Sequence, residues 1–500
     1  MQPVGLSFNR SRTRILSRQH RSAVVGTRST ASLTFCRNGD AVERIPTGFT
    51  GAIHGTWFLS VLFVAWVCLT TPARSELWCS GYYPGWEQGV MPASTIDFAA
   101  LTHIIHFSLV PNPDGSLDST VNVVSPSNSA DIVTRAHAAG RKVLVCVGGA
   151  NTQTGFEAAT SAANQGTFIT NLVNFMSARG YDGIDIDWEP LDQADAYAFT
   201  NFVSSLRTAL DAVTPRPMLT AAIASPPTPA AAIASVMDKF DQINLMTYDL
   251  SGPYLGWVTW FNAPIYDRGY KFPSTGRLVP STDGMVTSLT DAGIPPGKLG
   301  IGIAFFGWVW SGGTGTSTGG ASLPRQNWTT APTTTQSNYN AIITSFYQSN
   351  LYHWDDAAQA AYLSIDNAGS SNDKFISYED ARACQSKVIY ARNRHLGGVM
   401  IWELAQDHHA SQPDPLLQSI KQALATPGST NIQLADSNID LSFILIPLGS
   451  YQVQWTSNLH ATAWNTLTLT NVTGTGGILH VTDPAATNQS NRLYRVQAPP

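Results

Sequence analysis

Apolar positions follow two patterns along most of the chain. After Glu76, short runs of consecutive apolar residues alternate with longer amphipathic segments. The short runs predict buried strands, and the amphipathic segments predict helices. The predicted strands are Trp78–Tyr83, His103–Val110, Lys142–Val147, Gly183–Trp188, Met218–Ile223, Gln242–Tyr248, Leu299–Phe305 and Gly398–Trp402. The predicted helices include Ser129–Ala139, Gly166–Arg179, Asp195–Val213 and Tyr378–Arg394.

The regular alternation of eight strands with helices indicates an α/β fold. Eight such units over about 350 residues fit a single (β/α)8 TIM barrel, which we place at residues 76–425. A doubly wound open sheet is the alternative, because it also alternates strands and helices. The regularity of the alternation favours the barrel.

Two stretches interrupt this pattern. Residues 309–350 are rich in Gly, Ser, Thr and Asn, and predict an insertion after the seventh strand, either a small α+β flap or a mobile loop. Residues 426–430, TPGST, predict a linker. Residues 431–500 lack a helical period but contain several alternating runs, which predict a small all-β module of unknown role.

The first 75 residues differ in charge from the rest. They hold nine arginines, no lysine and two acidic residues, a net +7 in a chain of net −5. Residues 57–69 form an apolar run shorter than the roughly 20 residues of a membrane span, and the small-x-small pattern Ala73-x-Ser75 follows. We expect residues 1–75 to be a leader with a late secretory signal cleaved after Ser75, and the mature protein to be secreted without a stable membrane span. A buried core helix or a retained anchor is the alternative for 57–69.

Charge and cysteine content narrow the class of the remaining chain. Residues 76–500 carry −12, which argues against a basic nucleic-acid-binding surface. Three cysteines remain beyond residue 75, namely Cys79, Cys146 and Cys384, with no CxxC or Cys/His spacing. They predict buried free thiols and no metal site.

The segment 181–190, YDGIDIDWEP, concentrates acidic residues on a predicted strand. Side chains alternate between the faces of a strand, so Asp185, Asp187 and Glu189 share one face. In a barrel these carboxyls point inward and toward the carboxyl-end mouth, while the apolar residues of the other face pack against the helices. Their ionisations must be coupled, so at least one proton is retained near neutral pH, as general acid catalysis requires. A charged edge strand or a calcium site fits less well, because the opposite face is apolar and the backbone is regular.

The same segment resembles the DxxDxDxE signature of glycoside hydrolase family 18, the chitinases and their relatives. The four acidic positions are Asp182, Asp185, Asp187 and Glu189. Other motifs that resemble the family follow in the same order, namely GYYPGW at Gly81–Trp86, His106-Phe107, VCVGG at Val145–Gly149 with Cys146 where Ser is usual, NLMTYD at Asn244–Asp249 and GGVMIWELAQD at Gly397–Asp407. The resemblance covers residues 77–424 and implies a TIM-type barrel that acts on polymers of N-acetylglucosamine, without a cofactor.

The resemblance also implies catalytic roles. Glu189 would protonate the glycosidic oxygen while the 2-acetamido oxygen of the sugar attacks the anomeric carbon, in the substrate-assisted variant of retaining hydrolysis. Asp187 would hydrogen-bond the acetamido N–H, and Asp185 would share a proton with Asp187 from beneath. Tyr248 would donate its hydroxyl to the acetamido oxygen. Asp182 has the opposite parity to Asp185 and is interpreted as structural.

Further residues are implied in substrate binding. Asp249 would bind the sugar, Trp402 would form the floor of the reacting subsite, and Tyr83, Phe107 and Met246 would line the same pocket, although barrel packing is nearly as good an explanation for the last three. Four loop tryptophans suit stacking on sugar rings, and we expect two of them to do so. They are Trp257, Trp260, Trp308 and Trp310.

Two positions depart from the family pattern. Ala150 stands where many relatives carry an aromatic residue, and Phe306-Gly307-Trp308 stands where Tyr-Gly-Arg is frequent. These departures affect the subsites and leave the acidic signature intact. We therefore expect a monomeric chitinase that binds chitin or N-acetylglucosamine oligosaccharides. The alternatives are an endo-β-N-acetylglucosaminidase or another amino-sugar hydrolase of the family, and a non-catalytic chitin-binding lectin, which would usually lack the acid at position 189.

Overall fold

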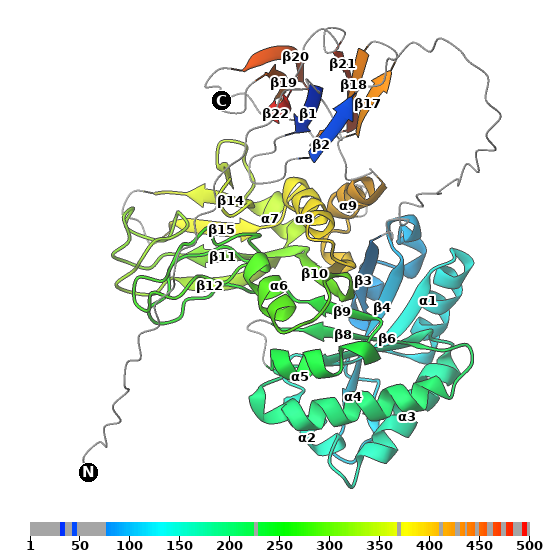
Figure 1. The fold of residues 1–500 in the computed structure, drawn as a ribbon. Coiled ribbons are helices and arrows are strands. Elements are labelled where there is room, and N and C mark those ends of the chain that lie inside the picture. The colour runs from blue at the N-terminus through cyan, green and yellow to red at the C-terminus, as the bar shows by residue number, and fades with distance from the viewer. Residues whose placement is uncertain are drawn as a thin grey trace, which may run out of the picture.

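Eight parallel strands form a closed barrel at the centre of the molecule (Figure 1). The computed structural model describes residues 77–224, 229–367, 372–409 and 414–425, and shorter stretches at 31–35, 43–47, 431–435, 438–445, 450–457, 464–471, 477–483 and 493–497. Around the barrel the strand order is β3-β4-β6-β7-β8-β9-β10-β16, and β16 pairs with β3 to close it. The strands are β3 (Trp78–Pro84), β4 (His103–Pro111), β6 (Lys142–Gly149), β7 (Gly183–Trp188), β8 (Met218–Ile223), β9 (Gln242–Leu245), β10 (Leu299–Ala304) and β16 (Gly398–Trp402). The prediction of a TIM barrel is confirmed.

Helices cover the outside of the barrel. They are α1 (Pro126–Ala138), α2 (Gln153–Ala159), α3 (Gln165–Arg179), α4 (Ala196–Asp211), α5 (Ala230–Ser235), α6 (Thr282–Asp291), α8 (Ala381–Asn393) and α9 (Pro415–Ala425). Helix α4 shows why these segments are helical, because its buried residues Phe199, Phe202, Leu206 and Leu210 are spaced three or four apart and form one apolar stripe. That stripe belongs to the large apolar layer between the strands and the helices.

The barrel interior is a second, smaller apolar layer. Tyr82, Cys146 and Met400 belong to it, whereas their chain neighbours belong to the outer layer. The alternation of side chains along each strand separates the two layers. The strands are therefore buried on both faces, as expected in an all-parallel barrel.

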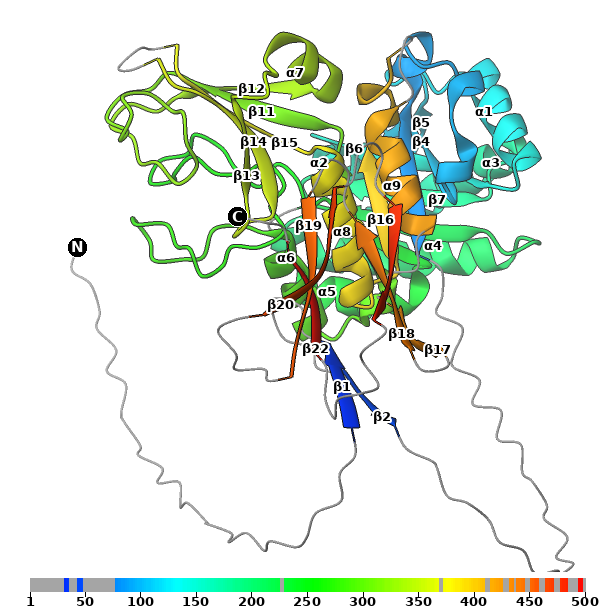
Figure 2. The ribbon, with the colours of Figure 1, turned by 90° about the horizontal axis from the view of Figure 1, so that it is seen from above.

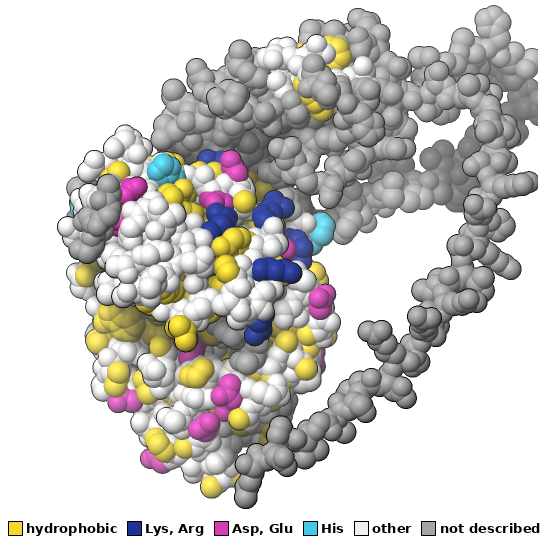
Figure 3. Space-filling model, turned by 90° about the vertical axis from the view of Figure 1, so that its left-hand side faces the viewer, with side chains coloured by type: hydrophobic (Ala, Val, Ile, Leu, Met, Phe, Trp, Pro, Cys, Tyr) yellow, Lys and Arg dark blue, Asp and Glu magenta, His cyan; other side chains and the backbone are white. Residues whose placement is uncertain are grey.

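An insertion follows β10 and forms a lobe beside the barrel (Figures 1 and 2). Its antiparallel sheet has the order β12-β11-β15-β14-β13 and is accompanied by helix α7. The elements are β11 (Phe306–Ser311), β12 (Thr333–Asn338), α7 (Tyr339–Ser345), β13 (Tyr352–Asp355), β14 (Ala360–Ile365) and β15 (Lys374–Tyr378). The predicted insertion after the seventh strand is confirmed. Its sheet begins before residue 309 and continues past residue 350, so the insertion is longer than the predicted 309–350. Figure 3 views the molecule from the side of this lobe, where much of the surface is neither hydrophobic nor charged side chains.

A buried ion pair fixes the end of the insertion to the barrel. Glu379, which directly follows β15, lies 2.9 Å from the Lys387 Nζ of α8, and both side chains are buried. Lys387 also donates to the carbonyl of Gly302 in β10 at 2.7 Å. These contacts join the residue after β15 to α8 and α8 to β10, and they give the buried Lys387 charge an anionic and a carbonyl partner.

Short strands outside the barrel form two further sheets. The first has the order β17-β18-β21, and the second has the order β2-β1-β22-β19-β20. Their strands are β1 (Ala31–Phe35), β2 (Glu43–Thr47), β17 (Asn431–Ala435), β18 (Asn438–Leu445), β19 (Ser450–Thr456), β20 (Asn465–Asn471), β21 (Gly477–Asp483) and β22 (Leu493–Gln497). The short strand β5 (Leu117–Asp118) belongs to neither sheet and pairs with β4. The all-β character predicted after the linker is confirmed, and two strands also lie within the stretch predicted as leader. The run 57–69 and the linker 426–430 lie outside the described residues, among which no helix has the length and hydropathy to cross a bilayer.

Candidate active site

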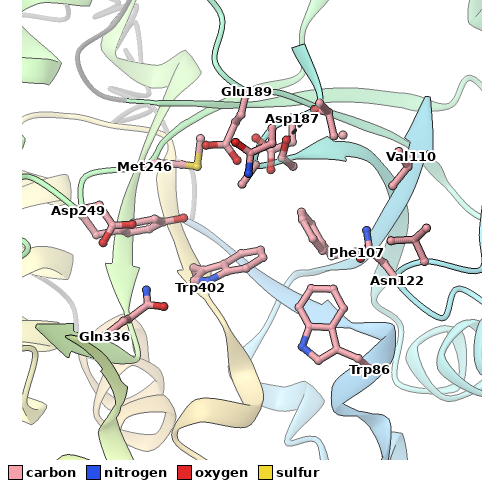
Figure 4. A pocket seen from close by; sticks show the side chains of 17 residues that line it. Trp86, Phe107, Val110, Asn122, Asp187, Glu189, Met246, Asp249, Gln336 and Trp402 are labelled. Atoms are coloured by element: carbon pink, nitrogen blue, oxygen red, sulfur yellow. Dashed lines mark hydrogen bonds between the residues drawn. The ribbon is translucent and has the colours of Figure 1, made fainter. Parts of the chain in front are cut away.

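The acidic strand β7 delivers its carboxyls to a cavity of about 520 Å³ at the carboxyl ends of the barrel strands (Figure 4). Asp187 is the inward residue near the end of β7, and Glu189 is the first residue after that strand. Figure 4 shows both side chains on one wall of the cavity, with Trp402 on the opposite wall. The predicted alternation of β7 thus brings Asp187 and Glu189 to one open space.

Two glycines at the end of β6 bring the backbone close to this wall. Gly148 and Gly149 both have positive φ, at 115° and 111°. A Cβ on Gly148 would collide with the backbone carbonyl of Asp187, and one on Gly149 would lie 2.6 Å from the ring of Phe107. Glycine is required here for both the backbone conformation and the close packing beside Asp187.

Asp185 lies beneath the cavity, fully buried in the barrel. Its two carboxylate oxygens accept hydrogen bonds from the Tyr82 hydroxyl at 2.8 Å and the Thr220 hydroxyl at 2.5 Å. The Cys146 thiol also donates a hydrogen bond to this carboxyl. Burial raises the pKa of Asp185 to about 6, and the three hydrogen bonds oppose that rise. Asp185 is thus held in one orientation below Asp187.

Asp187 and Glu189 are electrostatically coupled. Burial, together with the neighbouring carboxyls of Glu189 and Asp185, raises the pKa of Asp187 well above its ordinary range. Burial, followed by the negative charge of Asp249, raises the pKa of Glu189 to about 7. Three stacked carboxyls cannot all ionise in this setting, so a proton is retained among them at neutral pH. Asp187 Oδ1 is buried and has no hydrogen-bond partner in the described chain. Such an acceptor suits a donor supplied by a ligand.

The residues after β9 complete one end of the cavity. Met246, Tyr248 and Asp249 line it, although the strand pairing of β9 ends at Leu245, earlier than predicted. Within the described residues, the Tyr248 hydroxyl makes a long contact of 3.7 Å with the sulfur of Met400.

Asp249 lies at that end. Its side chain is in a crowded part of the protein, but it is exposed to the cavity. It adopts a positive φ of 55°, and its N–H donates to the Asn262 side chain at 2.9 Å. Trp308 donates its indole N–H to Asp249 Oδ1 at 2.6 Å. Burial raises the pKa of Asp249, and the Trp308 bond opposes that rise.

Aromatic side chains form the opposite wall and the other end. Trp402 and Phe107 pack edge to face with ring centres 4.7 Å apart. Trp86, which is 43% exposed, contacts Phe107 in the same way at 5.7 Å. Flat apolar rings at a cavity wall suit the apolar faces of sugar rings.

Tyr83 does not occupy its predicted position. Its ring lies in the outer layer, and its hydroxyl donates to the carbonyl of Met91 at 2.6 Å. Tyr82 is the residue that points into the barrel, where it contacts Asp185 and lies 5.5 Å from the ring of Trp402. The correction follows from strand parity, because adjacent residues of β3 face opposite layers.

The four loop tryptophans are not among the residues that line the cavity. Trp257 lies outside the cavity and packs against Phe272 with ring centres 4.7 Å apart. Trp260 and Trp310 are fully buried in a separate core of the insertion side. Only Trp308 reaches the cavity region, where it acts as a hydrogen-bond donor to Asp249.

Several residues of the cavity were not predicted. Trp86, Asn122 and Gln336 line it, and Tyr82 and Thr220 hold Asp185. The sequence could have indicated Tyr82 only through the alternation of side chains along β3, which decides whether Tyr82 or Tyr83 faces the barrel interior. Nothing in the sequence singled out Gln336, which belongs to the insertion and lies opposite Trp308 in the β11–β12 register. Within the described residues, no group of three or more His, Cys, Asp or Glu side chains is placed to hold a metal.

Comparison with known proteins agrees with this geometry. The model of the family described as "Glycosyl hydrolases family 18" matches residues 79–407, more than half of the chain. The chain belongs to glycosyl hydrolase family 18. The match includes β7 and every described barrel strand from Cys79 onward, so the carboxyl wall lies within the family domain.

Relatives within the family carry the name chitinase. Chitinase A1 of Niallia circulans is 30% identical over 359 residues, which cover 65% of this chain and 48% of that protein. Endochitinase 1 of Metarhizium robertsii is 29% identical over 313 residues, covering 60% of this chain and 69% of that protein. The structure of the Group IV chitinase of Ostrinia furnacalis in complex with allosamidin aligns with a TM-score of 0.60 at 22% identity, over 71% of this chain and all of that one. This chain thus spans about half the length of the first of these relatives, and the structural likeness supports the fold.

Proposed function

We propose that the protein is a chitinase that hydrolyses β-1,4-linked N-acetylglucosamine polymers with substrate assistance and retention at the anomeric carbon. The observation that carries the proposal is the pair Asp187 and Glu189 on one wall of a single cavity. Glu189 has a pKa raised to about 7, and Asp187 presents an unpartnered buried oxygen. A proton donor and a free acceptor two residues apart match the two demands of this chemistry.

In the first step the Glu189 carboxyl donates its proton to the glycosidic oxygen. The bond between that oxygen and the anomeric carbon breaks as the 2-acetamido oxygen of the same sugar bonds to the carbon. An oxazolinium ion forms and the leaving sugar departs with the proton of Glu189. Asp187 accepts a hydrogen bond from the acetamido N–H and stabilises the positive charge that develops.

In the second step the ionised Glu189 removes a proton from water as the water oxygen bonds to the anomeric carbon. The bond from the acetamido oxygen breaks, the amide re-forms, and Glu189 regains its proton. Two displacements at one carbon give net retention. Tyr248 donates its hydroxyl to the acetamido oxygen in this proposal, which is supported by its position in the cavity lining and by the long 3.7 Å contact of that hydroxyl with the Met400 sulfur. Trp402 provides the apolar floor for the reacting sugar.

Asp185 supports this wall as a positioning residue. Its carboxyl is fixed by Tyr82 and Thr220 and is sealed from solvent. A proton shared with Asp187 lets Asp187 carry more or less negative charge as the reaction proceeds. We also propose that the protein is secreted, on the strength of the apolar run 57–69 and Ala73-x-Ser75, and that it acts as a monomer.

Hydrolysis of labelled N-acetylglucosamine oligomers tests the proposal. Residues 76–500 should cleave the oligomers, and Glu189→Gln should lose about 10³-fold or more in kcat while still binding them, because the amide cannot donate the proton. Cleavage of N-glycans but not of chitin oligomers would replace the proposal with an endo-β-N-acetylglucosaminidase. Binding without cleavage by the unmodified protein would replace it with a chitin-binding lectin.

A further inference from the structure

One end of the cavity is acidic and has no basic residue. In Figure 4, Asp249 and Gln336 lie together at this end, with Trp86, Phe107 and Asn122 at the other. Seventeen residues line the cavity, and three of them are carboxyls, namely Asp187, Glu189 and Asp249. None of these described lining residues is Lys, Arg or His.

The hydrogen bond that the Asp249 carboxylate accepts comes from a neutral donor. Its Oδ1 accepts the Trp308 indole N–H at 2.6 Å, and its Oδ2 accepts no hydrogen bond within the described chain. A neutral donor orients the carboxylate but leaves its charge uncompensated.

The charge of Asp249 acts within the cavity. It raises the pKa of Glu189, and no cation contributes to the shifts of Glu189, Asp187 or Asp249. A cationic group of a ligand would therefore be stabilised at this end of the cavity.

The reacting sugar cannot supply that cation, because substrate assistance needs its acetamido group beside Asp187. The adjoining sugar can, since loss of its acetyl group converts the neutral amide into an ammonium. Resting on the proposed function, we propose that the end of the cavity formed by Asp249, Trp308 and Gln336 binds a glucosamine unit with a free amine, so that the enzyme prefers partly deacetylated chitin. Asp249 Oδ2 accepts from the ammonium, and the Gln336 side-chain oxygen is the second acceptor.

Gln336 offers a charge test with little risk to the fold. It is exposed on β12, and no described residue hydrogen-bonds its side chain. Gln336→Lys adds a competing cation to this end, and Gln336→Glu is the matched variant that adds an anion. Melting temperatures of both variants show whether the fold is retained.

The experiment compares kcat/KM for N-acetylglucosamine oligomers with that for oligomers carrying one glucosamine, at equal chain length. The unmodified protein should prefer the partly deacetylated oligomer by about threefold to fivefold, the size of one solvent-accessible ion pair. Gln336→Lys should abolish the preference, Gln336→Glu should increase it, and added salt should weaken it. Mass spectrometry of the products should place glucosamine in the unit that adjoined the reacting N-acetylglucosamine before cleavage.

The outcomes separate this inference from the proposed function. Glu189-dependent cleavage of both oligomers, with equal kcat/KM and no effect of either Gln336 variant, would overturn the glucosamine site and leave the chitinase proposal standing. Absence of Glu189-dependent cleavage of the fully acetylated oligomer would overturn both.

Discussion

The two faces of β7 are separated only by the width of a strand, yet their surroundings are opposite. The outer face, Ile184, Ile186 and Trp188, lies in the apolar layer under the helices, where Trp188 stacks on Phe156 with ring centres 4.6 Å apart. The inner face carries Asp185 and Asp187, whose burial as carboxyls raises their pKa values. The outer face gains free energy from burial, whereas the inner face loses it through desolvation and mutual repulsion. Stability and chemistry are thus assigned to opposite sides of one strand.

The largest effect is expected from the outer face. Trp188→Ala removes a buried stacked ring and leaves a cavity, so the free energy of unfolding should fall by about 3 to 5 kcal/mol. The kcat of the molecules that remain folded should change little. Denaturant unfolding and assays well below the melting temperature measure the two quantities. A stable variant that is inactive would contradict the division between the faces.

On the inner face, Asp187→Asn should act in the opposite sense. In the proposed mechanism this change removes the charge that stabilises the oxazolinium, and we expect kcat to fall by about 10²- to 10³-fold, or about 3 to 4 kcal/mol in the barrier. The free energy of unfolding should stay equal or rise, because a buried carboxyl beside two others is replaced by a neutral amide. Asp182→Asn is the matched control, since Asp182 holds Lys142 and His137 outside the barrel at 2.7 and 2.8 Å. A loss of kcat in the control equal to that of Asp187→Asn would refute the assignment.

The pH dependence of stability should come from the inner face. Burial raises the pKa of Glu189 from 4.5 to about 7, so the folded state holds this proton more tightly than the unfolded state does. The resulting stabilisation is complete below pH 4.5 and is lost as pH rises through about 7, by about 3 kcal/mol for this group. Glu189→Gln should therefore lose less stability than the unmodified protein between pH 4.5 and 7.5. Equal losses in urea unfolding at the two pH values would count against a buried, coupled Glu189.

The smallest effect distinguishes two adjacent tyrosines. Tyr82→Phe removes a hydrogen bond to buried Asp185 and should lower kcat by about tenfold, close to 1.4 kcal/mol. Tyr83→Phe removes the hydrogen bond to Met91 in the outer layer and should cost about 1 kcal/mol of stability with kcat unchanged. Steady-state rates and melting curves of the pair decide the point. A reversed pattern would place Tyr83, and not Tyr82, next to the reaction.

The pair Tyr82 and Tyr83 also shows what could not be predicted from the sequence alone. The barrel strands were predicted to within a few residues, because each is a short apolar run buried on both faces. The same property hides which residues face inward, so Tyr83 was selected in place of Tyr82. On β7 the carboxyls themselves reveal the parity, and the predicted shared face of Asp185 and Asp187 agrees with the structure.

The insertion was harder to predict for a related reason. Strand β12, TTTQSN, is mostly exposed and has no apolar pattern, so its Ser- and Thr-rich sequence looks like a loop. Trp260 and Trp310 were two of four candidates for stacking on sugars because they follow barrel strands, but they form part of the core of the insertion side. Contributions of Gln336 and Trp308 to the cavity depend on how this lobe packs on the barrel, which local patterns do not encode.

The central claim, substrate-assisted retention driven by Glu189, is tested most directly by following the anomers of the first products by NMR. A chitin oligomer incubated with residues 76–500 should release the β-anomer first, with the α-anomer appearing only as fast as spontaneous mutarotation allows. Initial release of the α-anomer would show inversion, and would contradict the assignment of Glu189 and the acetamido group to a double displacement.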